Sequence, residues 1–262
     1  MIDSRAQVAY HGAEDIEMIA SVSNSTQIHY PESDGKPMAE SELHLLQLLA
    51  LVFVLRTYFE RAQDVYVGGN MLMYFVEGDP TQSVAPDVFV VKGVPKRVHR
   101  VYKVWEDGKG PDVVIELSSR STRREDLGNK RVLYEELGVA EYYVFDPQRE
   151  YLDPPLRGHR LVNGTYQTAD GLTMFSEALG LELRVEGTEL RLFEPQRGEY
   201  LLTPPELTER VEELDERVEE LDERVEKLDA QLAQETGARR AAEEENTRLR
   251  AELERIRKQN AS

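Results

Sequence analysis

A glutamate inside an apolar segment is the residue of this sequence that most needs a chemical explanation. Glu116 lies near the end of Asp-Val-Val-Ile-Glu-Leu, residues 112–117, where a carboxylate is costly unless it is paired or binds a metal. Asp87 opens another apolar segment directly after Pro86. Two carboxylates at neighbouring strand ends would suit Mg²⁺ or Mn²⁺. The pattern therefore predicts a metal site formed by Asp87 and Glu116.

A lysine completes the candidate site. Asp126, Lys130 and Tyr134 are spaced by four in a predicted helix that follows Glu116, so they share one helix face. A bound metal would polarise a phosphoryl oxygen and lower the pKa of a bound water. The lysine could orient or deprotonate that water and offset charge in the transition state. This combination predicts phosphodiester hydrolysis.

Simpler roles exist for the same residues. Asp126 and Lys130 could form an exposed pair between positions i and i+4, Asp87 could cap a turn, and Glu116 could pair with an arginine. Asp112 competes with Asp87 for the metal, because it follows a proline and shares strand parity with Glu116. It opens the Glu116 strand about 13 Å from that glutamate, however, so Asp87 is the preferred ligand.

Other polar residues are weaker candidates. Glu40 or Glu42 could add an outer acid at the start of the first helix. The segment from Ser118 to Thr122 could contact phosphate through hydroxyls and amides near a helix start, or it could be a simple capped turn. The five histidines show no metal-ligand spacing.

The elements needed to position these residues can be predicted from periodicity and turn signals. A first helix is expected over 40–61, and a second is expected from a capping box at Thr122 and Glu125 to a stop at Leu137-Gly138. Hairpins with a turn at Asn163-Gly164 are expected over 147–173, and short strands over 179–202. The main strands are expected at 65–76, with an interruption at Gly68-Gly69-Asn70, and at 87–91, 112–117 and 141–145. The fold class is α/β (α+β), a mixed sheet flanked by helices.

The C-terminal segment carries a heptad repeat with valine at a and leucine at d, which favours a parallel two-stranded coiled coil. We expect an N-terminal extension over 1–38, a globular domain over 39–203 and a coiled-coil stalk over 204–262. Pro204-Pro205 should break the chain before the stalk, and the region near Gly237 should be weak or kinked. The alternative is a single solvated helix. The homodimer seam would be Val211, Leu214, Val218, Leu221, Val225 and Leu228.

Composition restricts the possible partners. The chain has no cysteine, so disulfides and thiolate metal sites are excluded. No signal peptide or membrane span is predicted, so a cytoplasmic protein is expected. A net charge of −18 disfavours DNA binding by bulk electrostatics, so DNA contacts would need local basic patches. The candidates are Lys92, Lys96, Arg97, Arg100 and Lys103 in one segment, and Arg120, Arg123, Arg124, Lys130 and Arg131 in another.

Four ordered segments, 86–91, 112–122, 126–134 and 137–147, together resemble the Uma-two family of restriction endonucleases, within the PD-(D/E)XK nuclease superfamily. The resemblance covers roughly residues 30–203. It implies a restriction-endonuclease-like fold and a Mg²⁺- or Mn²⁺-dependent enzyme acting on DNA, without a nucleotide cofactor. The acids map onto Asp87 and Glu116, with the Leu117 carbonyl as a further metal ligand. Ser118 stands where the superfamily usually has its lysine, and Lys130 would replace that lysine from the helix.

Two functions of different classes remain. One is a metal-dependent endonuclease in which a coiled-coil dimer presents one site to each DNA strand. The other is an inactive nuclease fold that recruits a partner through its acidic stalk. Asp87, Glu116 and Lys130 together favour the enzyme.

Overall fold

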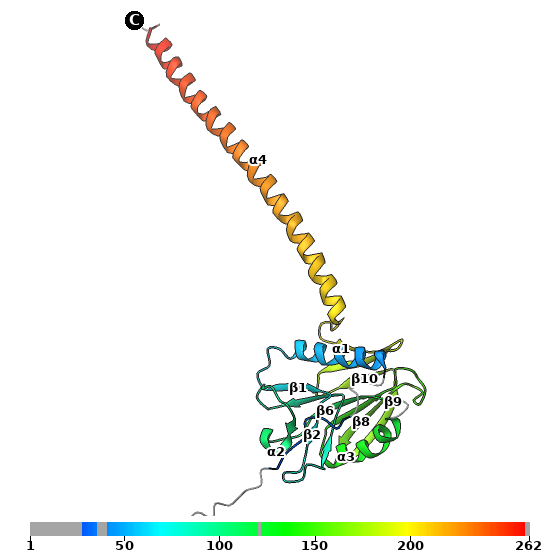
Figure 1. The fold of residues 1–262 in the computed structure, drawn as a ribbon. Coiled ribbons are helices and arrows are strands. Elements are labelled where there is room, and N and C mark those ends of the chain that lie inside the picture. The colour runs from blue at the N-terminus through cyan, green and yellow to red at the C-terminus, as the bar shows by residue number, and fades with distance from the viewer. Residues whose placement is uncertain (1–27, 36–40, 120–121, 260–262) are drawn as a thin grey trace, which may run out of the picture.

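The computed structural model describes residues 28–35, 41–119 and 122–259. It consists of a layered body and one long helix that leaves the body (Figure 1). The helices are α1 (Glu42–Tyr58), α2 (Val104–Asp107), the π-helical turn η1 (Glu125–Asn129), α3 (Lys130–Glu136) and α4 (Pro204–Gln259). The strands are β1 (Val65–Gly69), β2 (Met73–Tyr74), β3 (Ser83–Val84), β4 (Val88–Lys92), β5 (Tyr102–Lys103), β6 (Val113–Leu117), β7 (Glu141–Phe145), β8 (Leu156–Val162), β9 (Thr165–Gly171), β10 (Thr173–Ser176), β11 (Leu181–Glu186), β12 (Glu189–Glu194) and β13 (Glu199–Tyr200).

The body is built on a six-stranded mixed sheet with the order β1-β4-β6-β7-β8-β9. Only β6 and β7 run parallel in this sheet. Every residue of β6 and β7 is buried, as expected of strands covered on both faces. One face packs against α1 and the sheet β10-β11-β12-β13. The other packs against α3 and the small sheet β3-β2-β5. The predicted α+β class, a mixed sheet flanked by helices, is therefore confirmed.

Two turns expected from the sequence are found in the structure. The segment 65–76, expected to be interrupted at Gly68-Gly69-Asn70, is two strands in different sheets, because the chain turns at Asn70, whose φ is 47°. The predicted Asn163-Gly164 turn joins β8 to β9, with φ of 52° and 80° at its two residues. Positive φ at both positions matches the tight hairpin turn that Asn-Gly favours.

The predicted capping box at Thr122 and Glu125 is wrong by three residues. The Ser119 N–H donates to Thr122 Oγ1 at 3.1 Å, and the Thr122 N–H donates to Ser119 Oγ at 3.2 Å. These are the reciprocal bonds of a capping box. The helical segment that carries Lys130 is therefore anchored directly at the end of β6.

The stalk is one continuous helix, α4, which passes through Gly237 without interruption. The expected break at Pro204-Pro205 is wrong. Both prolines lie in the first turn of α4, where a missing N–H costs nothing and a fixed φ favours the helix. Within residues 28–35, 41–119 and 122–259, no helix is long and apolar enough to cross a bilayer.

Candidate active site

Glu116 lies near the end of β6 with its side chain fully buried. Its Oε2 is 2.9 Å from Lys130 Nζ, and its Oε1 accepts a 2.8 Å hydrogen bond from the Tyr134 hydroxyl. Lys130 and Tyr134 are four residues apart in α3, so both side chains point to the same strand. The helix face singled out in the sequence thus meets Glu116 inside the protein.

Asp87 directly precedes β4, which pairs antiparallel with β6. This pairing puts the start of β4 beside the end of β6. The Leu117 N–H donates to Asp87 Oδ2 at 2.8 Å, and the Asp87 N–H donates to Glu116 Oε2 at 3.3 Å. The two acids are therefore neighbours across adjacent strand ends.

His44 is a site residue that the sequence did not indicate. Its Nε2 lies 3.3 Å from Asp87 Oδ1. His44 is in the first turn of α1, whose N-cap Ser41 accepts a 3.2 Å hydrogen bond from the His44 N–H. The side chains of His44 and Asp87 are 10% and 14% exposed, against 1% for Glu116. Asp87 and His44 therefore form the side of the cluster that solvent can reach.

Asp126 supplies a third acid from the π-helical turn η1. Its Oδ1 lies 3.1 Å from Lys130 Nζ and its side chain is fully buried. The Lys130 N–H donates to the carbonyl of Glu125, five residues back, which defines the π-turn immediately before Lys130. π-turns of this kind often occur at functional sites. The pair is buried, so Asp126 and Lys130 are not an exposed ion pair.

The charges of the cluster do not balance. Burial raises the pKa of Glu116 well above its ordinary value, although Lys130 opposes this. Burial likewise raises the pKa of Asp126. Burial alone would lower the pKa of Lys130, but Glu116 and Asp126 raise it above the ordinary lysine value. The pKa of Asp87 lies below its ordinary value, because His44 and Lys130 outweigh the effect of burial. Lys130 is thus an ammonium facing an excess of carboxylates.

This donor set fits a divalent cation. In the described part of the chain, no three histidine, aspartate or glutamate side chains already converge as a metal site. The buried Asp126 carboxylate has the Lys130 ammonium at 3.1 Å and no well-directed hydrogen bond from a described residue. A second cation would offset both the burial and the repulsion between acids that together raise the pKa values of Glu116 and Asp126. Carboxylate oxygens are the ligands that Mg²⁺ and Mn²⁺ prefer.

The remaining candidates are placed as follows. Asp112 lies at the other end of β6, where Lys109 Nζ contacts its Oδ1 at 2.8 Å, so it is remote from Glu116. Ser118 directly follows β6, and its buried hydroxyl has no hydrogen-bond partner among the described residues. Leu117 is buried in the core. Glu40 and Arg120 lie outside the described residues.

The first basic segment is not a surface beside the acids. Lys92 ends β4, about 16 Å along the strand from Asp87, and its Nζ donates to the Ala178 carbonyl. Lys96 Nζ donates to the carbonyls of Phe59 and Glu60, just beyond α1. His44 lies at the opposite end of α1. Lys92 and Lys96 therefore lie away from the acid cluster, and their contact with DNA stays a prediction.

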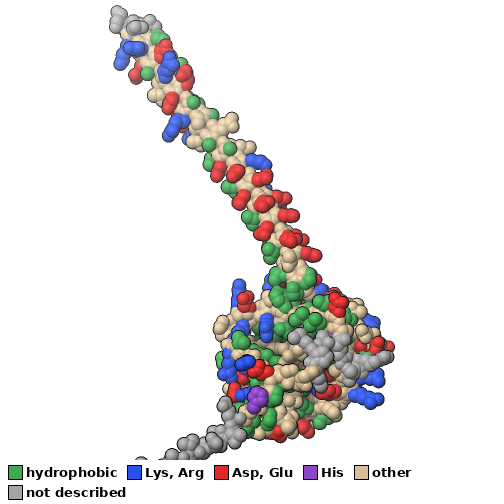
Figure 2. Space-filling view, viewed as in Figure 1, with side chains coloured by type: hydrophobic (Ala, Val, Ile, Leu, Met, Phe, Trp, Pro, Cys, Tyr) green, Lys and Arg blue, Asp and Glu red, His purple; other side chains and the backbone are tan. Residues whose placement is uncertain are grey.

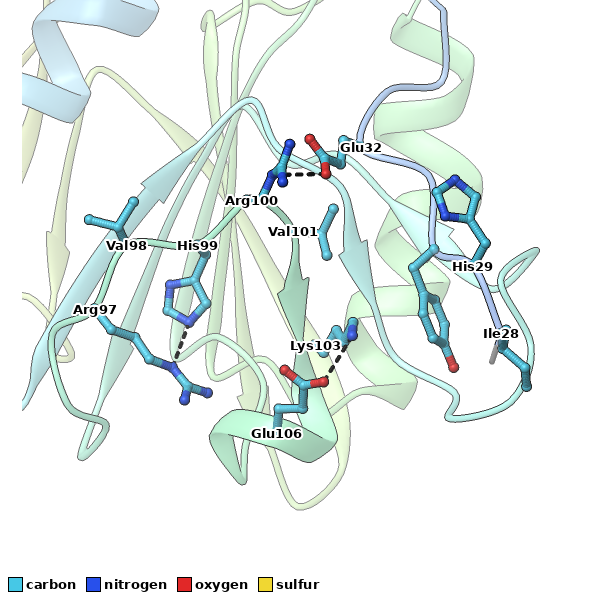
Figure 3. A pocket seen from close by; sticks show the side chains of 11 residues that line it. Ile28, His29, Glu32, Arg97, Val98, His99, Arg100, Val101, Lys103 and Glu106 are labelled. Atoms are coloured by element: carbon cyan, nitrogen blue, oxygen red, sulfur yellow. Dashed lines mark hydrogen bonds and ion pairs between the residues drawn. The ribbon is translucent and has the colours of Figure 1, made fainter. Parts of the chain in front are cut away.

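The other cations of this segment are neutralised by acids. Arg97 pairs with Asp107 at 2.7 Å, Arg100 with Glu32 at 2.9 Å and Lys103 with Glu106 at 2.8 Å. They line a separate cavity of about 600 Å³ between residues 28–32 and 97–106 (Figure 3). Arg97 is thus paired with an acid away from the cluster, and its contact with DNA stays a prediction.

The second basic segment does lie near the acids. Arg123 and Arg124 immediately precede η1, in the turn that leads from Glu116 to Lys130. The Arg123 guanidinium lies 4.9 Å from the ring centroid of Tyr151, and Arg124 is exposed. These two arginines are the described basic residues of that segment that could meet a polyanion close to the cluster.

The body is an α+β domain in which a mixed sheet brings two acids and a helix-borne lysine together. The family model of Uma2, described as "Putative restriction endonuclease", matches residues 14–226, so the chain belongs to the Uma2 family. A crystal structure of a "putative nuclease belonging to DUF820" from Anabaena variabilis ATCC 29413 is 16% identical. That match covers 54% of this chain and 74% of the other, with a TM-score of 0.40. No curated protein matches the chain.

Proposed function

We propose that this protein is a Mg²⁺- or Mn²⁺-dependent endodeoxyribonuclease. The observation that carries the proposal is the single cluster in which Lys130 contacts Glu116 while Asp87 stands beside Glu116 at the accessible side. When bound, the ion would polarise a phosphoryl oxygen and lower the pKa of a coordinated water. Asp87 and Glu116 would hold the ion, with the Leu117 carbonyl as a further ligand.

The protein residues have separate tasks in this proposal. Lys130 keeps its proton, because its pKa is raised, so it offsets negative charge on the phosphoryl group and does not act as a base. Tyr134 donates to Oε1 of Glu116 and so fixes the orientation of that carboxylate. His44 contacts Oδ1 of Asp87 while the Leu117 N–H donates to Oδ2, so the two contacts together orient that carboxylate. Rigid placement of this kind is what metal-assisted hydrolysis requires of its protein ligands.

DNA is the proposed substrate, because the matching family model is described as "Putative restriction endonuclease". With a net charge of −18, the protein must bind DNA through local contacts. Arg123 and Arg124 are the proposed phosphate contacts, and Arg120 is a further candidate. Dependence on these few cations predicts weak non-specific binding with a shallow salt dependence, because the slope grows with the number of phosphates that the protein neutralises.

The test is cleavage of plasmid and single-stranded DNA with Mg²⁺, Mn²⁺ or excess EDTA. Glu116→Gln and Lys130→Met should abolish cleavage that the wild type shows only with metal. Glu125→Gln is the matched control, because Glu125 is exposed in the same helical segment. Circular dichroism and Mn²⁺ calorimetry should accompany each variant.

A different outcome would favour the second function. If the folded wild type neither cuts nor binds Mn²⁺, the Lys130 ammonium serves as the permanent counter-ion of Glu116. The protein would then be an inactive nuclease fold that acts as a binding module. Cleavage that persists in both Glu116→Gln and Lys130→Met would indicate a contaminating nuclease and would refute this site.

A further inference from the structure

The stalk has an apolar stripe that nothing in the described structure covers. The six seam residues named above, Val211 to Leu228, are each between 47% and 55% exposed. They repeat at spacings of three and four along α4, so they form one continuous line. A single helix in water gains little from its intrinsic propensity, and a stripe of this kind is stable only against a partner.

The charges beside this stripe point to a second copy in parallel orientation. Within the chain, Arg210 pairs with Glu213 and Arg217 with Glu220. The aspartates at the heptad e position have no ion pair among the described residues of the chain. In a parallel dimer, the arginine at g faces the aspartate at e of the next heptad. These aspartates are Asp215, Asp222 and Asp229.

The stripe continues into an apolar cavity at the neck, where α4 leaves the body. This cavity has a volume of about 590 Å³ and lies between α1, β12 and the first turn of α4. Leu46 and Leu49 of α1 line it and are 58% and 50% exposed. Pro204 also lines it and occupies the a position one heptad before Val211. Figure 2 shows hydrophobic side chains gathered at this neck and along the stalk.

Polar contacts fix the stalk to the body at the neck. Glu206 Oε2 accepts hydrogen bonds from the N–H and the hydroxyl of Thr203, both at 2.8 Å. Arg191 of β12 also contacts Glu206 Oε2 at 2.8 Å and donates to the Leu201 carbonyl at 3.4 Å. These contacts fix the direction in which α4 leaves the body, and with it the orientation of the apolar stripe relative to the neck cavity.

We propose that a second copy of this chain covers the stripe and the neck cavity as one continuous interface. A parallel coiled coil begins with both necks at the same height, so the two bodies must lie side by side there. In a two-fold dimer the same patch on each copy meets its counterpart. Leu46 and Leu49 of each body therefore face the two-fold axis. The dimer fixes the two bodies against each other at the neck as well as along the stalk.

The absence of cysteine from the sequence allows a clean test by cross-linking of full-length single-cysteine variants. Leu49→Cys reports on the neck and Leu221→Cys on the stalk seam. Thr165→Cys is the control, because Thr165 is exposed on the β8–β9 hairpin and does not line the neck cavity. Mild oxidation should convert most of the Leu49→Cys and Leu221→Cys chains to dimer, and little of Thr165→Cys.

A second variant tests whether the two parts form one interface. Val218→Asp with Leu221→Asp should reduce the mass by light scattering from twice the 30.0 kDa chain to the single chain. The same pair should abolish cross-linking through Leu49→Cys. The matched control, Glu216→Asp with Glu219→Asp, changes exposed heptad positions and should leave the dimer intact.

Three results would overturn the proposal. A wild-type mass of one chain would remove the dimer altogether. Cross-linking at Leu221→Cys without cross-linking at Leu49→Cys would show that the second copy leaves the neck cavity open. Dimers that persist in the Val218→Asp, Leu221→Asp variant would show that the stalk does not hold them. None of these results depends on nuclease activity.

Discussion

Replacing Lys130 with methionine should strongly destabilise the body, because the substitution leaves two buried carboxylates without their cation. Lys130 Nζ lies 2.9 Å from Glu116 and 3.1 Å from Asp126, and the two carboxylate side chains are 1% and 0% exposed. At an effective dielectric of about 20, each contact corresponds to about 5–6 kcal/mol of attraction. Desolvation of the ammonium offsets much of this, so the net loss should be about 3–5 kcal/mol.

Urea unfolding followed by tryptophan fluorescence is the suitable assay. The single tryptophan, Trp105, lies in α2 of the body, so the signal is independent of stalk unfolding. Lys109→Met is the control, because Lys109 pairs with Asp112 and is 40% exposed. That control should lose less than about 1 kcal/mol. Equal losses in Lys130→Met and Lys109→Met would refute the account of the buried cluster.

The same variant should depend on pH in a defined direction. Without Lys130, the folded state should bind a proton on Glu116 or Asp126 at pH values where the unfolded state does not. Its stability should therefore increase as the pH falls through the raised pKa of that carboxyl group towards the ordinary carboxyl range. Adding Glu116→Gln to Lys130→Met should restore part of the lost stability. A double-mutant cycle with no coupling would contradict the 2.9 Å ion pair.

Three further predictions concern other sites. Asp87→Asn should abolish metal-dependent cleavage and lower the urea midpoint at neutral pH, because the lowered pKa of Asp87 means that its charged form stabilises the fold; retained cleavage would remove Asp87 from the site. Gly68→Ala should cost about 1–3 kcal/mol, because its Cβ would lie 2.4 Å from Phe89 Cζ. In the control Gly128→Ala, the new Cβ would have no atom within 4 Å, so the free energy of unfolding should not fall. Equal urea midpoints in the Gly68→Ala and Gly128→Ala variants would refute the predicted clash. Burial lowers the pKa of His159 to about 4 from an ordinary 6.5. As the pH falls, the His159 imidazole therefore gains its proton at a higher pH in the unfolded state than in the folded state. The free energy of unfolding should consequently fall as the pH drops from about 7 to 4. His159→Gln should lack this part of the loss, and identical pH profiles would contradict the shift.

Much of the acid cluster was predictable because its signals are local. A carboxylate in a strand without polar alternation marks Glu116. A spacing of four marks Asp126, Lys130 and Tyr134 as one helix face. Both signals depend on the geometry of a single element, which the sequence specifies directly. The roles of these residues in hydrolysis stay predictions.

The missed features depend on how distant elements meet. His44 reaches Asp87 only because α1 packs across the sheet, and no local pattern announces that contact. The position of the basic segment at Lys92 was likewise not visible in a count of charges. Lys92 lies five residues along the chain from Asp87, at the opposite end of β4.

The π-turn at η1 has a consequence for how members of this family can diverge. A π-turn uses one residue more than an α-helical turn. Deleting one residue from 127–129 would let the segment close as a regular α-helix and would bring Asp126 from four residues to three residues before Lys130. Asp126 would stay on the face that meets Lys130, because positions i and i+3 also share a helix face, while Lys130 and Tyr134 would stay on Glu116. A relative that lacks one residue here could therefore carry a regular helix in place of the π-turn and keep all three acids of the cluster.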